Sequence, residues 1–158
     1  IYGDIADRSG FDAPDDAARL AKALDVRVHG RASEHLMPGQ TGEMNRLTLV
    51  PRSPVLCLGP GPAAAQAQVN AVRALGGLAV AARGKVEPQL LESLPVLSAV
   101  LWWGDAEQAR ALAQALVRRD GPIVPLITAL PDAAHVLHER HLCVDTTAAG
   151  GNAALLAG

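Results

Sequence analysis

Aromatic residues are scarce in this 158-residue chain, which has two Trp, one Tyr and one Phe. Such a composition excludes a protein that stacks nucleic-acid bases on rows of aromatic rings. An excess of one charge sign is lacking too, since 14 Lys and Arg stand against 16 Asp and Glu and the formal charge is -2. No cationic surplus is available to bind phosphates or an anionic lipid surface. We therefore expect neither nucleic acid nor a membrane surface as a partner.

Cysteine is limited to Cys57 and Cys143, which lie far apart in apolar, strand-like runs. This placement predicts two buried thiols in a reducing compartment and excludes a disulfide framework. No apolar run reaches the roughly 18 residues of a membrane span, and no signal peptide is recognisable. We expect a cytoplasmic protein without membrane insertion. The chain starts at Ile1 and not at Met, which fits a piece of a longer polypeptide or a processed chain.

Hydrophobic residues make up 49% of the chain, enough for one well-buried core, so one main domain is expected. We predict that residues 1–36 are an N-terminal linker and a helix, and that residues 37–158 form the main domain. The helix is expected over residues 14–24, because residues 12–16 supply a cap, a proline and acidic side chains for its first turn.

Turn-forming residues dominate positions 37–42, and two strand-like segments follow at 46–50 and 55–58. Pro51, Ser53 and Pro54 interrupt the pairing between these segments. Proline lacks the backbone donor that a central strand needs, so a bent, protruding β-hairpin is favoured. We predict a flap over about residues 40–58.

From Val55 onward, strand-like and helix-like segments alternate, which is typical of a parallel sheet with helices on both faces. The fold class predicted is α/β, a small doubly wound, Rossmann-like sheet of about five strands with the β-hairpin flap appended. The predicted strands are 55–58, 78–82, 99–103, 123–127 and 142–145, and the predicted helices are 62–75, 87–94, 106–118 and about 131–137.

Two local features of this sheet are also expected. Ile123 and Ile127 should face one side of their strand and Val124 and Leu126 the other, all buried. The neighbouring Trp102 and Trp103 should place one ring in the core and the other beneath a helix on the opposite face.

Residues 59–64, Gly-Pro-Gly-Pro-Ala-Ala, match the G-x-G-x-x-A pattern of a pyrophosphate-binding turn between a strand and a helix. Gly59 and Gly61 are therefore weak cofactor-binding candidates. Pro60 and Pro62 remove backbone donors, and the next strand ends in Ala81-Ala82-Arg83 without the acid that binds the ribose. A tight turn is the favoured interpretation, and a nucleotide-binding regulatory module remains the alternative.

Three histidines, His135, His138 and His141, recur every third residue and could gather around a metal on one continuous helix. A strand is expected to start at Leu142, which would turn His141 away, so solvated or interface histidines are favoured and no metal site is predicted.

No catalytic residue is predicted. The thiols lie in apolar strands without a group that would lower their pKa. Carboxylates such as Asp15, Asp16 and Asp145 are expected on a solvated surface or at a helix cap.

Residues 40–52, Gln-Thr-Gly-Glu-Met-Asn-Arg-Leu-Thr-Leu-Val-Pro-Arg, resemble the flap of the C-terminal domain in long proline utilization A proteins. Residues 145–153, Asp-Thr-Thr-Ala-Ala-Gly-Gly-Asn-Ala, resemble the closing motif of that domain, so the tail 145–158 is expected to form it. The resemblance places the following residues in interfaces: Thr41, Gly42, Glu43, Asn45, Arg46, Pro51, Arg52, Thr146, Thr147, Gly150, Gly151 and Asn152.

Residues 119–127 resemble the stretch of the aldehyde dehydrogenase domain that leads into its catalytic glutamate. Here Thr-Ala-Leu-Pro follows at 128–131, Gly-Asp-Ala-Glu at 104–107 replaces the cofactor-contacting turn, and no nucleophilic cysteine motif occurs. The resemblance thus implies a degenerate aldehyde-dehydrogenase-like Rossmann domain that is not an enzyme and binds no cofactor.

The same resemblance implies a parent protein in which an FAD-dependent domain oxidises proline and an NAD-dependent domain oxidises glutamate semialdehyde. The intermediate would pass through a tunnel between them. This chain is then expected to be a scaffold that seals the tunnel and supports oligomer contacts. Its expected partner is the catalytic dehydrogenase domain of the same parent, in cis or across a dimer. An autonomous enzyme is the least supported reading.

Overall fold

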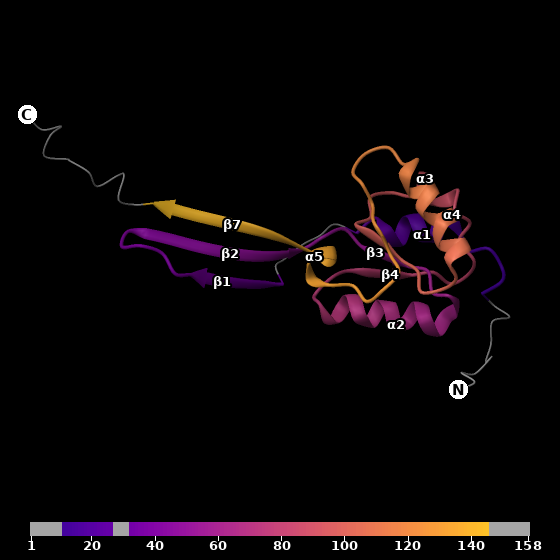
Figure 1. Ribbon diagram of the computed structural model, residues 1–158, viewed down its shortest axis with the longest axis horizontal. Coiled ribbons are helices and arrows are strands. Elements are labelled where there is room, and N and C mark those ends of the chain that lie inside the picture. The colour runs from indigo at the N-terminus through magenta and orange to yellow at the C-terminus, as the bar shows by residue number, and fades with distance from the viewer. Residues whose placement is uncertain (1–10, 27–31, 146–158) are drawn as a thin grey trace, which may run out of the picture.

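The computed structural model describes residues 11–26 and 32–145, and it contains a parallel and an antiparallel sheet (Figure 1). The parallel sheet has the strand order β4-β3-β5-β6, with β3 at Val55–Cys57, β4 at Ala79–Ala81, β5 at Ala99–Leu101 and β6 at Leu126–Ile127. The antiparallel sheet has the order β1-β2-β7, with β1 at Ser33–Met37, β2 at Glu43–Pro51 and β7 at Leu137–Asp145. The α/β class is confirmed.

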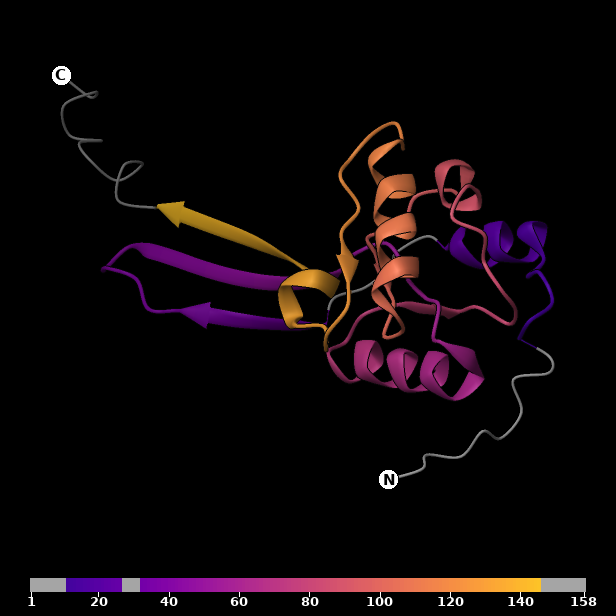
Figure 2. The ribbon, with the colours of Figure 1, turned by 45° about the vertical axis from the view of Figure 1, so that its right-hand side comes forward.

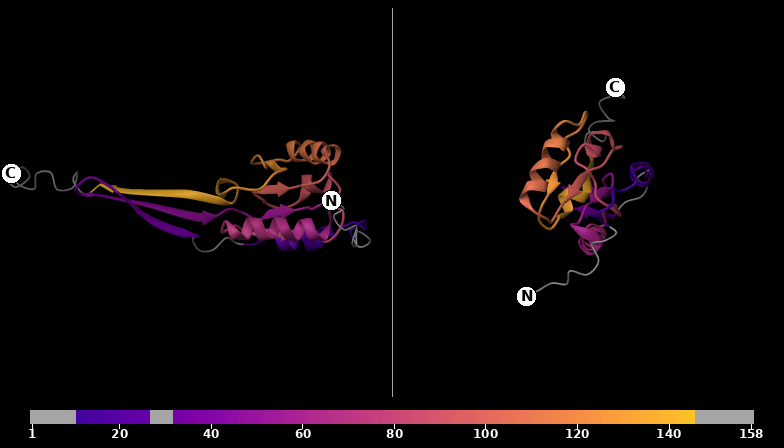
Figure 3. Two further views of the ribbon diagram at one scale, coloured as in Figure 1. Left: turned by 60° about the horizontal axis from the view of Figure 1, so that its bottom comes forward. Right: turned by 90° about the vertical axis from the view of Figure 1, so that its right-hand side faces the viewer.

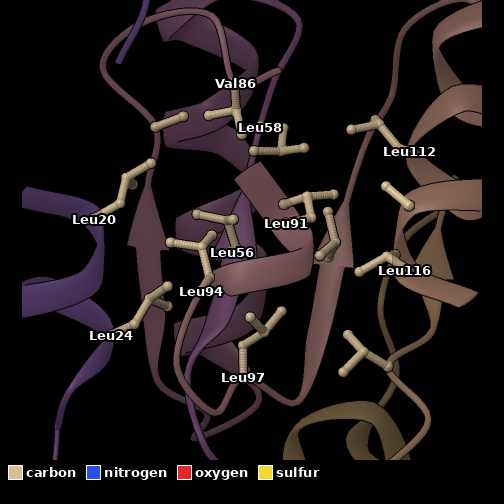
Figure 4. Packing of buried hydrophobic residues seen from close by; sticks show 14 residues of the cluster. Leu20, Leu24, Leu56, Leu58, Val86, Leu91, Leu94, Leu97, Leu112 and Leu116 are labelled. Carbon is tan, nitrogen blue, oxygen red and sulfur yellow. The ribbon is translucent and has the colours of Figure 1, made fainter. Parts of the chain in front are cut away.

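Helices cover both faces of the parallel sheet, as a doubly wound fold requires (Figure 2). The helices are α1 at Ala17–Leu24, α2 at Gly61–Ala74, α3 at Leu90–Ser93, α4 at Ala106–Val117 and α5 at Ala133–Val136. Figure 4 shows the first face, where leucines of α1, α3 and α4 pack on Leu56 of β3. Val55 and Cys57 point to the other face and pack with α2 and α5.

Helix starts follow the predicted caps. The Asp16 carboxylate accepts hydrogen bonds from the backbone N–H groups of Ala18 and Arg19, and Asp105 accepts one from Gln108 at the start of α4. Pro62 lies in the first turn of α2, where its missing donor costs nothing. The starts of α2 and α4 are therefore as the sequence predicts. Helix α1 begins at Ala17 and not at residue 14, because Pro14 and Asp15 pair with Lys85 in a β-bridge before the helix.

The flap is built from different strands than predicted. β2 pairs along its whole length with β7 and also with β1, after a turn that contains Gly42 at φ 90°. Val55–Cys57 is not the second strand of this hairpin, because it is a fully buried central strand of the parallel sheet. The prolines at 51 and 54 mark the crossing between the two sheets.

Residues 142–145 also belong to the antiparallel sheet, so they are not a fifth strand of the parallel sheet. The physical reason is the composition of β7, Leu-His-Glu-Arg-His-Leu-Cys-Val-Asp, which puts charged and polar side chains on both faces. Such a strand cannot be covered by helices without burying those groups. It is stable only in a sheet that water reaches.

The antiparallel sheet projects from the helical body as a long arm (Figures 1 and 3). Within the described residues, no helix lies over its outer half. We call this three-stranded sheet, β1, β2 and β7, the arm. β1 begins at Ser33, so the arm extends across the boundary that the sequence suggested at residue 37.

The prediction for residues 123–127 is correct only in part. Val124 and Ile127 are buried and Leu126 is half-buried, but Ile123 is 95% exposed. The chain enters the edge of the sheet through Gly121, at φ 95°, and through Pro122, so the strand forms only at Leu126. Neither tryptophan is buried in full: Trp102 packs against the α1–α3–α4 side of the core, and the Trp103 ring N–H donates to the Ala129 carbonyl at 2.9 Å.

Candidate functional site

The glycine turn after β3 is closed by a buried glutamine. Gln68 of α2 is 0% exposed, and its amide accepts from Gly59 N–H at 3.0 Å and donates to Gly59 C=O at 2.8 Å. Gly59 adopts φ 96°, and a Cβ there would lie 2.5 Å from the Gly61 nitrogen. Glycine is thus required by the turn itself.

This arrangement removes donors that a phosphate would need. The Gly59 N–H is engaged inside the protein, and Pro60 and Pro62 have none. At the end of β4, the backbone N–H of Arg83 donates to Asp15 at 2.6 Å, and no acid is present at 81–83 to bind a ribose. The sequence analysis missed Gln68, although a polar residue on the buried face of α2 is a signal that could have indicated such a contact.

An open cavity of about 560 Å³ nevertheless lies beside this turn. It sits at the carboxyl ends of β3 and β5, between which the strand order reverses, and such crevices hold nucleotides in doubly wound folds. Its lining includes Phe11, Leu58, Lys85, Val86, Trp102 and Gln108. The Trp102 ring N–H donates to the Asp105 carbonyl at 3.0 Å, and Lys85 lies 3.0 Å from Glu87.

Asp15, expected on a solvated surface or at a cap, instead joins α1 to the sheet. Its side chain is 1% exposed and lies 2.7 Å from the Arg19 guanidinium, which also donates to the Ala81 carbonyl. Burial opposes ionisation of Asp15, but hydrogen bonds from Arg19 and from the Arg83 backbone outweigh it, so the Asp15 pKa is below its usual range. The pair therefore joins α1 to the end of β4.

The two thiols differ. Cys57 is buried, and burial raises its pKa to about 12 despite the positive charge of Arg73, so it is not a nucleophile at neutral pH. Cys143 is exposed, and the prediction that it is buried is wrong. It lies on β7 of the arm, where no second layer of residues 11–26 or 32–145 covers it.

The three histidines do not converge. His135 caps α5, accepting from Asp132 N–H at 3.1 Å and donating its own N–H to the Asp132 carboxylate at 3.2 Å. His138 and His141 are three residues apart on β7 and therefore point to opposite faces. Burial, Arg52 and Arg140 together lower the His138 pKa. Among the described residues, no group of three or more His, Cys, Asp or Glu side chains could hold a metal ion.

The structure brings the seven described residues of the predicted interface to the arm or its base. Thr41 and Gly42 form the tip, and the backbone and side chain of Arg52 donate to the carbonyls of Val136 and Leu137 at 2.8 and 3.0 Å. The other members, Glu43, Asn45, Arg46 and Pro51, are on β2. Thr146, Thr147, Gly150, Gly151 and Asn152 lie outside the described residues. Contact with a partner remains a prediction for all of them.

In the part of the chain that the structure describes, no helix is long and apolar enough to cross a bilayer. This finding concerns helices alone.

Comparison with known proteins gives relatives of one kind, although no family model matches. The chain is 35% identical to the bifunctional protein PutA of Escherichia coli over 147 residues, which cover 78% of the chain and 11% of that protein. It is 33% identical to PutA of Salmonella typhimurium over a stretch of the same extent. The chain therefore spans about a tenth of the length of these curated relatives.

Solved structures of proline utilization A are also similar. A variant of the Bradyrhizobium japonicum protein shares 27% identity at a TM-score of 0.49 and is matched over 70% of this chain and 14% of its own. The sequence identity to the curated relatives, over more than three quarters of the chain, shows that this chain is homologous to one segment of the bifunctional PutA proteins.

Proposed function

We propose that this chain is a non-catalytic structural domain of a cytoplasmic, proline-catabolic enzyme. In the parent, FAD would serve the oxidation of proline and NAD the oxidation of glutamate semialdehyde to glutamate. The domain would pack on the catalytic aldehyde dehydrogenase domain, in cis or across a dimer, and help to seal the path of the intermediate. Homology to a segment of PutA proteins supports the enzyme class.

The arm is the observation that carries this proposal. It extends away from the helical body, and within the described residues its outer half has no covering layer (Figure 3). A small sheet without a second layer gains stability when its apolar face is covered, and exposed apolar side chains on such a face mark a surface that another protein covers. Leu36 and Leu142 are 73% and 48% exposed there.

The groups that could do chemistry are engaged in the fold. Gly59 hydrogen-bonds to Gln68, Asp15 is paired with Arg19, and Cys57 is a buried thiol with a raised pKa. These contacts support a domain whose catalytic and cofactor-binding elements have been replaced by structural ones.

The test is to remove this segment from the parent enzyme. We expect proline oxidation, measured with a dye, and semialdehyde oxidation, measured as NADH, to keep their separate rates. The coupled conversion of proline to glutamate should acquire a longer lag before NADH forms, because the intermediate escapes into solvent. Loss of either separate rate would show that the domain supports catalysis directly, and an unchanged lag would remove the sealing role.

A nucleotide-binding regulatory module is the second candidate, and the cavity at the reversal of strand order is the observation that favours it. Saturable binding of NAD, NADP or ATP to the chain at micromolar concentration, lost on Gly61→Pro substitution, would support this function. Absence of binding to all three would leave the structural function alone.

A further inference from the structure

One face of the arm arranges its side chains in rows that the strand register defines. Arg46 of β2 is directly opposite Leu36 of β1 and Leu142 of β7, so the arginine stands between two leucines on the same face. The next row toward the tip pairs Met44 with Val144. We call these five residues the Arg46 face.

Three apolar members of the Arg46 face are open to solvent, and the fourth, Val144, is half-buried. Leu36 is 73% exposed, Leu142 48% and Met44 41%. Leucine and methionine side chains gathered around one position of a sheet are unfavourable in water, and such patches are typical of surfaces that bind another protein.

Arg46 itself lacks a complete set of partners. Its side chain is 35% exposed and forms an ion pair with Glu34, whose carboxylate lies 3.8 Å from Nε. Nε itself is buried and donates no hydrogen bond to any described residue, because this separation is beyond hydrogen-bond distance. A buried guanidinium nitrogen without an acceptor is costly, and a carboxylate is its best acceptor because it can pair with the planar group through two bonds.

The charges on the arm separate by face. The row below Arg46 contains Glu34, Thr48 and Arg140, so this face has two arginines and one glutamate. The opposite face, by the same register, has Glu43, Glu139 and Asp145. A second copy of the chain that stacked the same face on itself would bring arginines together, which disfavours that occupant.

We propose that the Arg46 face binds a segment of the parent polypeptide that lies outside this chain and presents apolar side chains around one carboxylate. The carboxylate accepts hydrogen bonds from the Arg46 guanidinium, and the apolar side chains cover Leu36, Met44 and Leu142. Curated relatives have about nine tenths of their length outside the matched segment, since the chain covers 11% of them. This inference rests on the proposed structural function and adds the docking face and the chemistry of the partner.

The first test measures cover over the face in the intact parent. Leu142→Cys and His141→Cys place thiols on opposite faces of β7, each in a Cys143→Ser background, and maleimide labelling is followed peptide by peptide by mass spectrometry. We expect the thiol at 142 to react with maleimide at least about tenfold more slowly than the thiol at 141. Arg46→Met should remove most of this difference in rate, because a charge-assisted hydrogen bond in a dry contact stabilises the covered state by at least about that factor. Equal labelling at both positions would overturn the proposal.

The second test identifies the carboxylate. Arg46→Lys, made with Glu34→Gln to remove the neighbouring acid, offers an amine to a zero-length carbodiimide. We expect the lysine at position 46 to cross-link to one peptide from outside this segment. The control is Thr48→Lys in the same background, which should give no such cross-link because position 48 lies one row away on the same face. A cross-link to a second copy of this segment, or none at all, would overturn the choice of partner.

The two proposals fail in different ways. If both faces label equally but removal of the whole segment lengthens the lag, the docking face is wrong and the structural function stands. If the face is covered and cross-linked but removal leaves the lag unchanged, the docking is correct and the sealing role is wrong.

Discussion

At the scale of single residues, three positions engage polar or reactive side chains inside the fold. Gln68 satisfies both backbone groups of Gly59, Asp15 holds α1 on the sheet through Arg19, and Cys57 is sealed in the core. Each is a polar or reactive group that is hydrogen-bonded or buried within the fold.

Gln68→Leu should lower the free energy of unfolding of the chain by about 2 to 4 kcal/mol, because two buried backbone groups lose their partners. Gln66→Leu is the matched control, since Gln66 is exposed on the same helix and bonds only to Asn70; it should change stability by less than about 0.5 kcal/mol. Urea unfolding monitored by tryptophan fluorescence measures both. Equal effects of the two substitutions would show that the Gln68–Gly59 pair is not important.

Asp15 should make the fold sensitive to acid. Its pKa is lower in the folded chain than in the unfolded one, so its contribution is complete above the unfolded value of about 3.9 and is lost as pH falls through the folded pKa. Asp15→Asn should reduce stability at neutral pH and flatten the loss of stability between about pH 5 and 2. The urea midpoint across this range tests the prediction, with the exposed Asp12→Asn as control. A slope that Asp15→Asn leaves unchanged would contradict it.

At the scale of elements, the two sheets follow different rules. The parallel sheet is covered by helices, so its central strands β3 and β5 are buried at every position. The arm is uncovered, so β7 is exposed at six consecutive positions, from His138 to Cys143. The edge strand β6 lies between these cases, with Val124 buried just before it and Ile123 exposed.

Val124→Asp should destabilise the fold by several kcal/mol, roughly 3 or more, because an unpaired charge would enter the core beside α4. Ile123→Asp offers a control one residue away, since that side chain is 95% exposed, and its effect should be within about 0.5 kcal/mol of zero. The melting temperatures of the two variants, each compared with that of the unchanged chain, test this prediction. Similar losses in both would mean that Ile123 is covered in solution.

At the scale of the whole molecule, the chain divides into a helical body with its own core and an arm without one (Figures 1 and 3). The tail that follows β7 lies outside the described residues. Its glycines and alanines offer little apolar area but allow another backbone to approach closely, so we expect it to bind another domain or subunit of the parent.

Deletion of residues 147–158 from the parent should leave each active site working on its own substrate and weaken the coupled conversion of proline to glutamate. The decisive quantity is the lag in NADH formation, measured beside the two separate rates. An equal lag in the truncated and intact enzymes would remove the sealing role of the tail. Loss of one separate rate would mean that the tail supports catalysis.

Local structure and the family resemblance could be predicted from the sequence. Local features depend on neighbours within a few residues, so a sequence pattern can predict them. Examples are the caps Asp16 and Asp105, the glycine turn at 59–61 and the alternation of strands with helices. The motif at 40–52 indicated the relationship that the comparison with PutA proteins then confirmed.

The pairing of strands into sheets could not be predicted from the sequence. β1 and β7 flank β2 although about 90 residues separate β2 from β7 along the chain, and this long-range pairing removed Val55–Cys57 from the predicted hairpin and Leu142–Asp145 from the parallel sheet. The contact of Asp15 with Arg83 likewise joins positions 68 residues apart, and that of Gln68 with Gly59 depends on how α2 packs against the end of β3. Strand partners and buried polar pairs depend on surfaces that form only when the chain folds. Each strand takes the place in which the whole molecule buries its apolar side chains and pairs its hydrogen-bonding groups.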